Sequence, residues 1–261
     1  MPTIMKPLPF FAAVLLCLLL GACAATPAPP LTRQVLALAD DAKALQTFDE
    51  LALRHRDSYD RLRPYLNPQQ DASEQALNQQ RRAMHADVAL IQQGLAQYLQ
   101  GLGQLARQDR LAYTSEINSA GVALCAWPGT GIADREVTAY TILLRLLARM
   151  RGEQAQRQTL GQALRDGDAA MQTLVSALTT LLHLYDKAGD NERDIVLGLL
   201  EMDIAFADTP SQRLLAVLAK TVQQSKTDEY RLYGLRHTLA QRQLAALASE
   251  HARLAALEEL P

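Results

Sequence analysis

The sequence predicts an all-α fold, an elongated antiparallel helical bundle of five or six helices, several of them long and with heptad patterning. The chain is rich in the helix formers Ala, Leu, Gln and Arg, and only 5% of its 261 residues are aromatic. Apolar residues recur at alternating spacings of three and four positions through two long stretches. No alternation of apolar and polar residues is long enough to predict a sheet.

Proline residues set the limits of the first two helices. We expect one helix from after Thr32 to Arg63, because Pro64 disfavours the helical conformation at the residue before it. Asn67 is then a candidate N-cap, with Pro68 at the first helical position. The second helix should have about 38 residues and a length of about 57 Å. Its heptad positions are Leu77, Met84, Val88, Ile91, Leu95, Tyr98, Leu102 and Leu105.

A second and longer heptad pattern begins after Asp134. It predicts one long helix that kinks or breaks near residues 166–168 and stops at Gly189-Asp190. A shorter helix is expected over about 191–207. The sequence Thr209-Pro210-Ser211-Gln212 is typical of a capping box and predicts the start of a last helix that runs nearly to the C-terminus.

The N-terminal residues have a different composition from the rest of the chain. Lys6 is the only charged residue before an apolar stretch from Leu8 to Leu20. Its 13 residues are too few for a membrane-spanning helix but fit the apolar region of a secretory signal peptide. The stretch ends in Leu20-Gly21-Ala22-Cys23, and a Pro-rich segment, residues 24–31, follows it.

This ending resembles the lipobox of bacterial lipoproteins, in which a leucine and two small residues precede a cysteine. The resemblance implies that Cys23 receives a diacylglycerol thioether and that signal peptidase II cuts between Ala22 and Cys23. The new amine would then be acylated, for example with palmitate. The alternatives are an ordinary signal peptide cut at Ala22 or Ala25, and an anchor that is not cleaved.

The resemblance divides the chain into three parts. Residues 1–22 would be the signal peptide, residues 23–31 the lipidated cysteine with a short tether, and residues 32–261 the helical bundle. Ala24 follows the cysteine, which favours the outer membrane, with the bundle facing the periplasm. Another membrane of the cell envelope is the alternative location.

Charge and cysteine content limit the partners of the mature chain. Loss of Lys6 with the signal peptide leaves 25 basic and 28 acidic residues, a net charge of −3, so no basic surplus favours nucleic acid. Because Cys17 leaves with the signal peptide and Cys23 carries lipid, Cys125 has no intramolecular partner. We expect Cys125 to be buried and inert, with an intermolecular disulfide as the alternative.

Residues 117–133 form an uncharged segment between the two longest helical patterns and contain the only tryptophan, Trp127. One interpretation is a helix end and loop folded into the bundle, with Trp127 and Cys125 in the core. The other is an exposed apolar tip that contacts a membrane or a partner, since indole rings favour such interfaces.

We find no pattern that predicts catalysis, a metal site or a cofactor. The five histidines lack the spacing of a zinc site, and we expect each at the surface or the edge of the bundle. Acidic residues at positions 186–194 do not have EF-hand spacing and are expected to mark a helix stop and an N-cap. No GxSxG sequence is present. The chain is therefore not expected to be an enzyme.

The leading functional hypothesis is a lipid-anchored envelope protein that acts as a structural or interaction module. Its partners would be the membrane, through the lipid anchor, and a periplasmic or outer-membrane protein complex. Exposed apolar residues outside the core register would mark the docking face. The alternative is a membrane-active or inhibitory protein that uses the 117–133 segment as an apolar tip.

Overall fold

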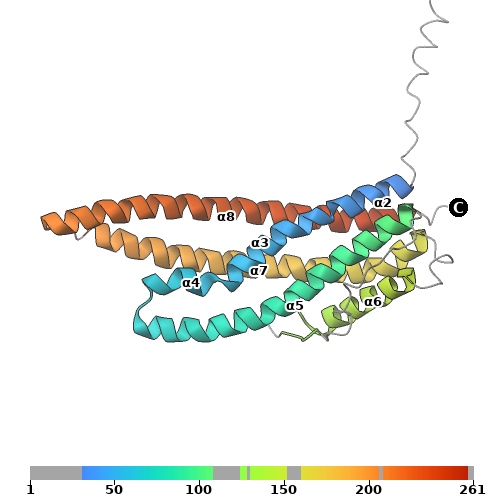
Figure 1. The fold of residues 1–261 in the computed structure, drawn as a ribbon, viewed down its shortest axis with the longest axis horizontal. Helices are drawn as coiled ribbons and strands as arrows, with labels where there is room; N and C mark the ends of the chain where they lie inside the picture. Colours follow the sequence, from blue (N-terminus) through green and yellow to red (C-terminus); the bar gives the residue numbers. More distant parts are fainter. Residues whose placement is uncertain (1–30, 108–123, 128–129, 152–159, 206–207, 258–261) are drawn as a thin grey trace, which may run out of the picture. The chain divides into compact units, whose positions relative to one another are not determined.

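The computed structural model describes residues 31–107, 124–127, 130–151, 160–205 and 208–257. Throughout these residues the chain is helical apart from short connections and a single bridge between Trp127 and Ile132 (Figure 1). The predicted all-α helical bundle is thereby confirmed. The proposed signal peptide and lipidation site, with Leu20, Gly21, Ala22 and Cys23, lie outside the described residues.

The N-terminal part of the bundle is a series of short helices. They are α2 (Leu31–Asp40), the 3₁₀ turn η1 (Asp41–Lys43), α3 (Ala44–Arg56), α4 (Ser58–Leu62) and the 3₁₀ turn η2 (Arg63–Tyr65). The expectation of one uninterrupted helix up to Arg63 is wrong. Asp40 and Asp41 are weak helix formers at the first interruption, and Asp57 leaves the helical conformation at the second, with φ −96° and ψ 16°.

Helix α5 (Pro68–Arg107) begins where the sequence predicts. The side chain of Asn67 accepts hydrogen bonds from the backbone N–H groups of Gln69 and Gln70, at 3.1 and 2.9 Å. The Gln70 side chain accepts one in return from the Asn67 N–H at 3.1 Å. These bonds satisfy N–H groups that have no partner within the helix and fix its first turn.

Helices α6 (Asp134–Arg151), α7 (Leu160–Ala205) and α8 (Pro210–Ala256) follow. The expectation of one long helix from after Asp134 is wrong, because α6 and α7 are separate helices that pack against each other. The expected break near residues 166–168 and the expected stop at Gly189-Asp190 are also wrong, because α7 is continuous and includes residues 191–205. Both glycines instead make room for a tyrosine. A Cβ on Gly167 would collide with the phenol of Tyr98, and one on Gly189 would collide with the ring of Tyr233.

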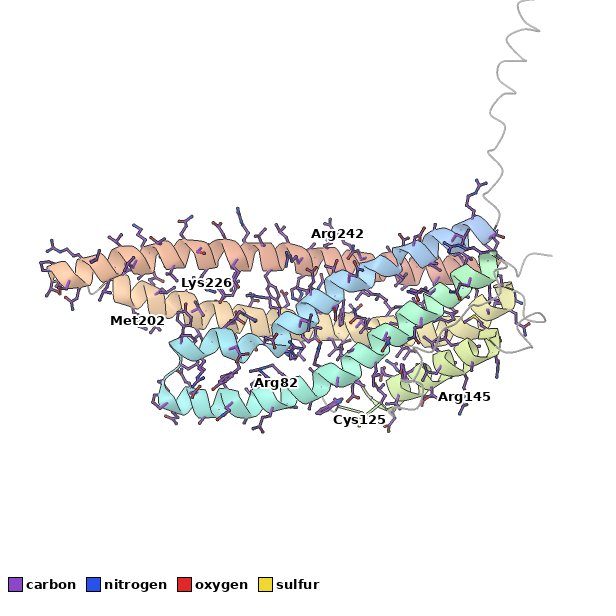
Figure 2. The ribbon with its side chains drawn as sticks, in the orientation of Figure 1. Arg82, Cys125, Arg145, Met202, Lys226 and Arg242 are labelled. Carbon is purple, nitrogen blue, oxygen red and sulfur yellow. The ribbon has the colours of Figure 1, made fainter. Side chains whose placement is uncertain are left out.

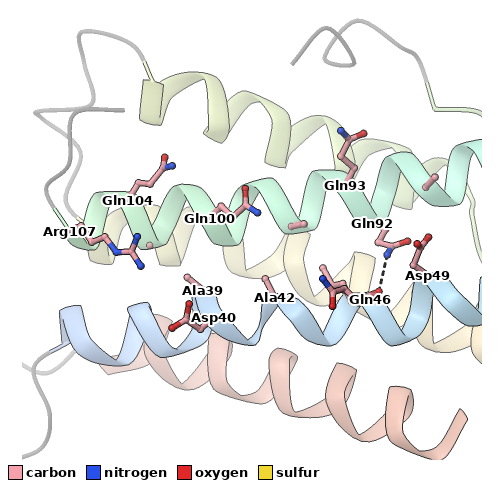
Figure 3. A pocket seen from close by; sticks show the side chains of 14 residues that line it. Ala39, Asp40, Ala42, Gln46, Asp49, Gln92, Gln93, Gln100, Gln104 and Arg107 are labelled. Atoms are coloured by element: carbon pink, nitrogen blue, oxygen red, sulfur yellow. Dashed lines mark hydrogen bonds between the residues drawn. The ribbon is translucent and has the colours of Figure 1, made fainter. Parts of the chain in front are cut away.

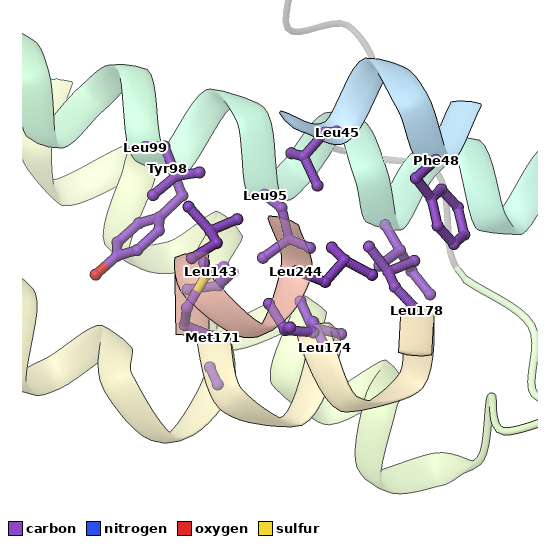
Figure 4. Close-up of a cluster of buried hydrophobic side chains, with 14 of the residues drawn as sticks. Leu45, Phe48, Leu95, Tyr98, Leu99, Leu143, Met171, Leu174, Leu178 and Leu244 are labelled. Carbon is purple, nitrogen blue, oxygen red and sulfur yellow. The ribbon is translucent and has the colours of Figure 1, made fainter. Parts of the chain in front are cut away.

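The α2–α3 segment packs against both α5 and α8, whereas α7 packs against α8, α6, α5 and α3. The short connections from η2 to α5 and from α7 to α8 make these neighbours antiparallel (Figure 1). Side chains from the facing helices form one large apolar core (Figure 4). Its members include Phe48 from α3, Leu95 from α5, Leu143 from α6, Leu178 from α7 and Leu244 from α8.

The core does not extend along the whole of α7 and α8. A smaller buried cluster of Leu62, Val196, Leu200 and Tyr230 lies where α4, α7 and α8 meet. Between residues 208 and 229 no residue is buried, and in Figure 1 the α7–α8 hairpin continues past α4 and the start of α5. We call residues 201–205 and 208–222 the hairpin end. Within the described residues, no helix is both long and apolar enough to cross a membrane.

Candidate interaction surface

Large apolar side chains on the surface are concentrated on α8. Those at the hairpin end, which we call the hairpin-end patch, are Met202, Leu214, Leu215, Val217, Leu218 and Val222. Those farther along α8, which we call the outer stripe, are Leu232, Leu235 and Leu239. Soluble monomers rarely expose contiguous apolar patches of this kind unless the patch is a binding site.

The hairpin-end patch lies just after a well-defined helix start. The Thr209 side chain accepts a hydrogen bond from the Gln212 N–H, and the Gln212 side chain accepts one from the Thr209 N–H, so the predicted capping box is confirmed. The next apolar residues, 214–222, cover about 160° of the circumference of α8, at about 100° per residue. A helix with so wide an apolar face is normally covered. No described residue buries this face, and Met202 is also exposed, in the last turn of α7 (Figure 2).

The outer stripe lies on the side of α8 that faces away from the bundle. The buried residues of α8 recur at spacings of three and four positions from Tyr230 to Leu254. Leu232, Leu235 and Leu239 each follow a buried residue by two positions, which is about 200° around the helix. Helix α8 therefore has two apolar faces, and the bundle covers only one of them.

Trp127 and Cys125, the two candidate residues of the 117–133 segment, have different environments in the structure. Trp127 is half-buried against the main core, its indole N–H donates to a carboxylate oxygen of Asp87, and its backbone N–H donates to Ile132 at 2.7 Å. Cys125 is exposed (Figure 2), so the expectation that it is buried is wrong. Leu124 is buried in the core, whereas Cys125 and Ala126, which follow it, are exposed. Residues 117–123, 128 and 129 lie outside the described residues.

Three histidines are buried, contrary to the expectation that they lie at the surface or edge. They are His55, His237 and His251. The His251 ring has Nδ1 at 2.8 Å from Asp168 and Nε2 at 3.0 Å from the Tyr98 hydroxyl. Burial lowers the pKa of His251, although Asp168 opposes the shift. The Tyr98 and His251 side chains are fully buried, whereas the Asp168 side chain at the end of this polar chain is 31% exposed.

The position of Glu192 also differs from the predicted one. Glu192 lies inside α7 and does not mark the start of a new helix. Its carboxylate is 3% exposed and forms ion pairs with Arg54 at 3.3 Å and Arg61 at 2.8 Å. Tyr230 donates a further hydrogen bond to it at 3.3 Å. Together, the two ion pairs and this hydrogen bond join α3, α4, α7 and α8 next to the smaller buried cluster that contains Tyr230. Among the described residues, no group of three or more His, Cys, Asp or Glu side chains is arranged to hold a metal ion.

A groove of about 560 Å³ lies between the α2–α3 segment and α5 (Figure 3). Its polar lining is mainly amide, from Gln46, Gln92, Gln93, Gln100 and Gln104. One of these side chains, Gln92, donates to the Leu45 carbonyl oxygen at 2.8 Å. The groove is open to solvent, and we therefore regard α8, with its exposed apolar side chains, as the stronger candidate for a functional surface. No protein-family model, curated protein or solved structure matches this chain.

Proposed function

We propose that this protein is a lipid-anchored protein of the bacterial cell envelope that acts as an interaction module. Its lipid would be attached at Cys23, and it would dock to a periplasmic or outer-membrane protein complex through α8. The observation that carries the proposal is the apolar surface of α8, which no described part of the bundle covers.

Exposed aliphatic side chains favour a protein partner because their burial is the main favourable term in most protein association. The hairpin-end patch and the outer stripe follow one helix, so a partner could contact both with a single helical or grooved surface. A charged side chain in either group would interrupt this apolar contact. The proposal therefore assigns the docking role to the exposed apolar side chains of α8, including those of the outer stripe.

The position of the tether supports a role in which the hairpin end contacts a partner. Residue Leu31, where the tether joins the bundle, begins α2, and Gln34 of α2 accepts a hydrogen bond from Arg253 of α8 at 2.9 Å. Leu214 lies 39 residues before Arg253 on the same helix, which corresponds to about 59 Å. In a polyproline conformation, residues 24–31 would reach only about 25 Å. The bundle would thus carry the docking surface far from its point of attachment.

The alternative function uses the 117–133 segment as a membrane-active tip. Its described residues include Leu124 and Ile132, which are buried in the core, and Trp127, which is bonded to Asp87. These contacts favour the α8 surface over the 117–133 segment as the site of interaction.

Affinity purification from detergent-solubilised envelope, with a Cys23→Ser control, tests the proposal. We expect the wild-type protein in the membrane fraction, labelled by a palmitate analogue and bound to a stoichiometric protein partner. The Cys23→Ser variant should lose the label and the membrane attachment. A wild-type protein without label and without partner would contradict the proposal.

A further inference from the structure

We infer that the hairpin-end patch pairs with the same patch of a second copy of this chain, so that two α7–α8 hairpins form an intermolecular four-helix bundle. The inference rests on the proposed function, because it names a partner for the same surface. It leaves the outer stripe of α8 for the envelope complex.

The area of the patch matches what a stable dimer needs. Its six side chains are between 39% and 66% exposed. With on the order of 120 Å² of apolar surface per fully exposed aliphatic side chain, the patch offers roughly 400 Å². A standard interface buries about 800 Å² on each partner, of which about 57%, or roughly 450 Å², is apolar. One copy of the patch thus supplies the apolar share of one side of such an interface.

The geometry of the hairpin end also fits a second hairpin. Two antiparallel helices present an apolar layer on one side of the pair, and four-helix bundles bury such layers against each other. Leu215 and Val222 lie on the side of α8 that becomes buried from Tyr230 onward, but here no described helix other than α7 reaches them. A second hairpin would continue the core past the cluster of Leu62, Val196 and Tyr230.

The charges around the patch favour a second copy over a lipid surface. The charged residues of the hairpin end are the acidic Glu201, Asp203 and Asp208 and the basic Arg213 and Lys220. Acidic and basic side chains are thus nearly balanced, so two copies meet without strong like-charge repulsion. Anionic lipid surfaces attract clusters of Lys and Arg, and the hairpin end has no such cluster.

Sedimentation equilibrium of the full mature chain in detergent, corrected for bound detergent, tests the inference. We expect a protein mass of twice the chain mass for the wild type and a single chain mass for Leu215→Glu/Leu218→Glu. Leu77→Glu changes a leucine of comparable exposure on α5, away from the hairpin end, and should remain dimeric. Circular dichroism should show the same helix content in all three proteins, because none of these side chains is buried.

A second measurement tests whether the two copies contact each other at the hairpin end. In a Cys125→Ser background, Thr221→Cys at the hairpin end should form an intermolecular disulfide under mild oxidation, whereas exposed Thr138→Cys on α6 should not. A monomeric wild type, or a dimer that Leu215→Glu/Leu218→Glu leaves intact, would overturn the inference. A monomer that still binds an envelope partner would overturn the inference but leave the proposed function standing. A dimer that has neither lipid nor an envelope partner would support the inference but contradict the proposed function.

Discussion

Acid should destabilise this bundle through its buried histidines, and His55 gives the clearest test. The His55 ring is 8% exposed and stacks on Tyr185 with the ring centroids 4.4 Å apart. Its Nδ1 atom is buried without a hydrogen-bond partner. Burial, and then the positive charges of Arg81 and Arg61, lower the pKa of His55 from 6.5 to about 3.

The lowered pKa means that the unfolded chain binds a proton at His55 before the folded chain does. The contribution of neutral His55 to stability is therefore intact above about pH 6.5 and is lost progressively as the pH falls toward 3. At pH 5 the loss amounts to about 2 kcal/mol. This loss is a large part of the free energy of unfolding of a typical domain, which is roughly 5 to 15 kcal/mol. Burial also lowers the pKa of His237 and of His251, so both add to the loss with the same sign.

Urea unfolding followed by circular dichroism at pH 7 and pH 5 measures this loss. His55→Phe keeps an aromatic ring against Tyr185 but cannot bind a proton. Its free energy of unfolding should fall less between pH 7 and pH 5 than that of the wild type, by about 2 kcal/mol. His183→Gln, which changes an exposed histidine of α7, should behave as the wild type does. Equal losses in the wild type and in His55→Phe would refute the reasoning.

Three further changes test the packing. Gly189→Ala should lower the stability by about 1 to 3 kcal/mol, because the new methyl group meets a tyrosine ring, whereas Gly234→Ala, with no neighbour within 4 Å, should raise Tm slightly. Glu192→Gln should cost about 2 to 3 kcal/mol in urea unfolding because the partly buried Arg61 loses its charge partner, whereas Arg54 keeps its ion pair with Glu229. The exposed Asp190→Asn should cost under about 1 kcal/mol. Trp127→Ala should cost about 2 kcal/mol, and an unchanged free energy of unfolding would instead favour an exposed 117–133 tip.

The local sequence signals predicted where α5 and α8 begin, but not where α3 and α4 begin or that α7 continues through Gly189. Asn67 with Pro68, and Thr209 with Pro210, start α5 and α8 as expected, because a cap depends on residues within one turn. Gly189 was interpreted as a helix stop because glycine is a weak helix former. Its actual role depends on Tyr233, which lies more than 40 residues later and is brought next to it only by the fold.

The candidate surface depends on the fold in the same way. The heptad analysis identified apolar stripes, but a periodic pattern does not tell which stripe another helix covers. Residues 214–222 resemble an ordinary core-facing segment in the sequence, and they are exposed because α4 and the start of α5 do not reach them. Likewise, the burial of Glu192 follows from Arg54 and Arg61, which no local pattern connects to it.

The central claim is that α8 carries the docking surface of an anchored protein. The most direct test is to purify the tagged full-length wild type, Leu235→Glu and Leu77→Glu in parallel from detergent-solubilised envelope and to quantify the copurifying partner by mass spectrometry. We expect a stoichiometric partner with the wild type and with Leu77→Glu, and at least a tenfold loss with Leu235→Glu, which places a charge in the outer stripe. Equal recovery with Leu235→Glu and the wild type would show that the partner binds elsewhere and would contradict the claim.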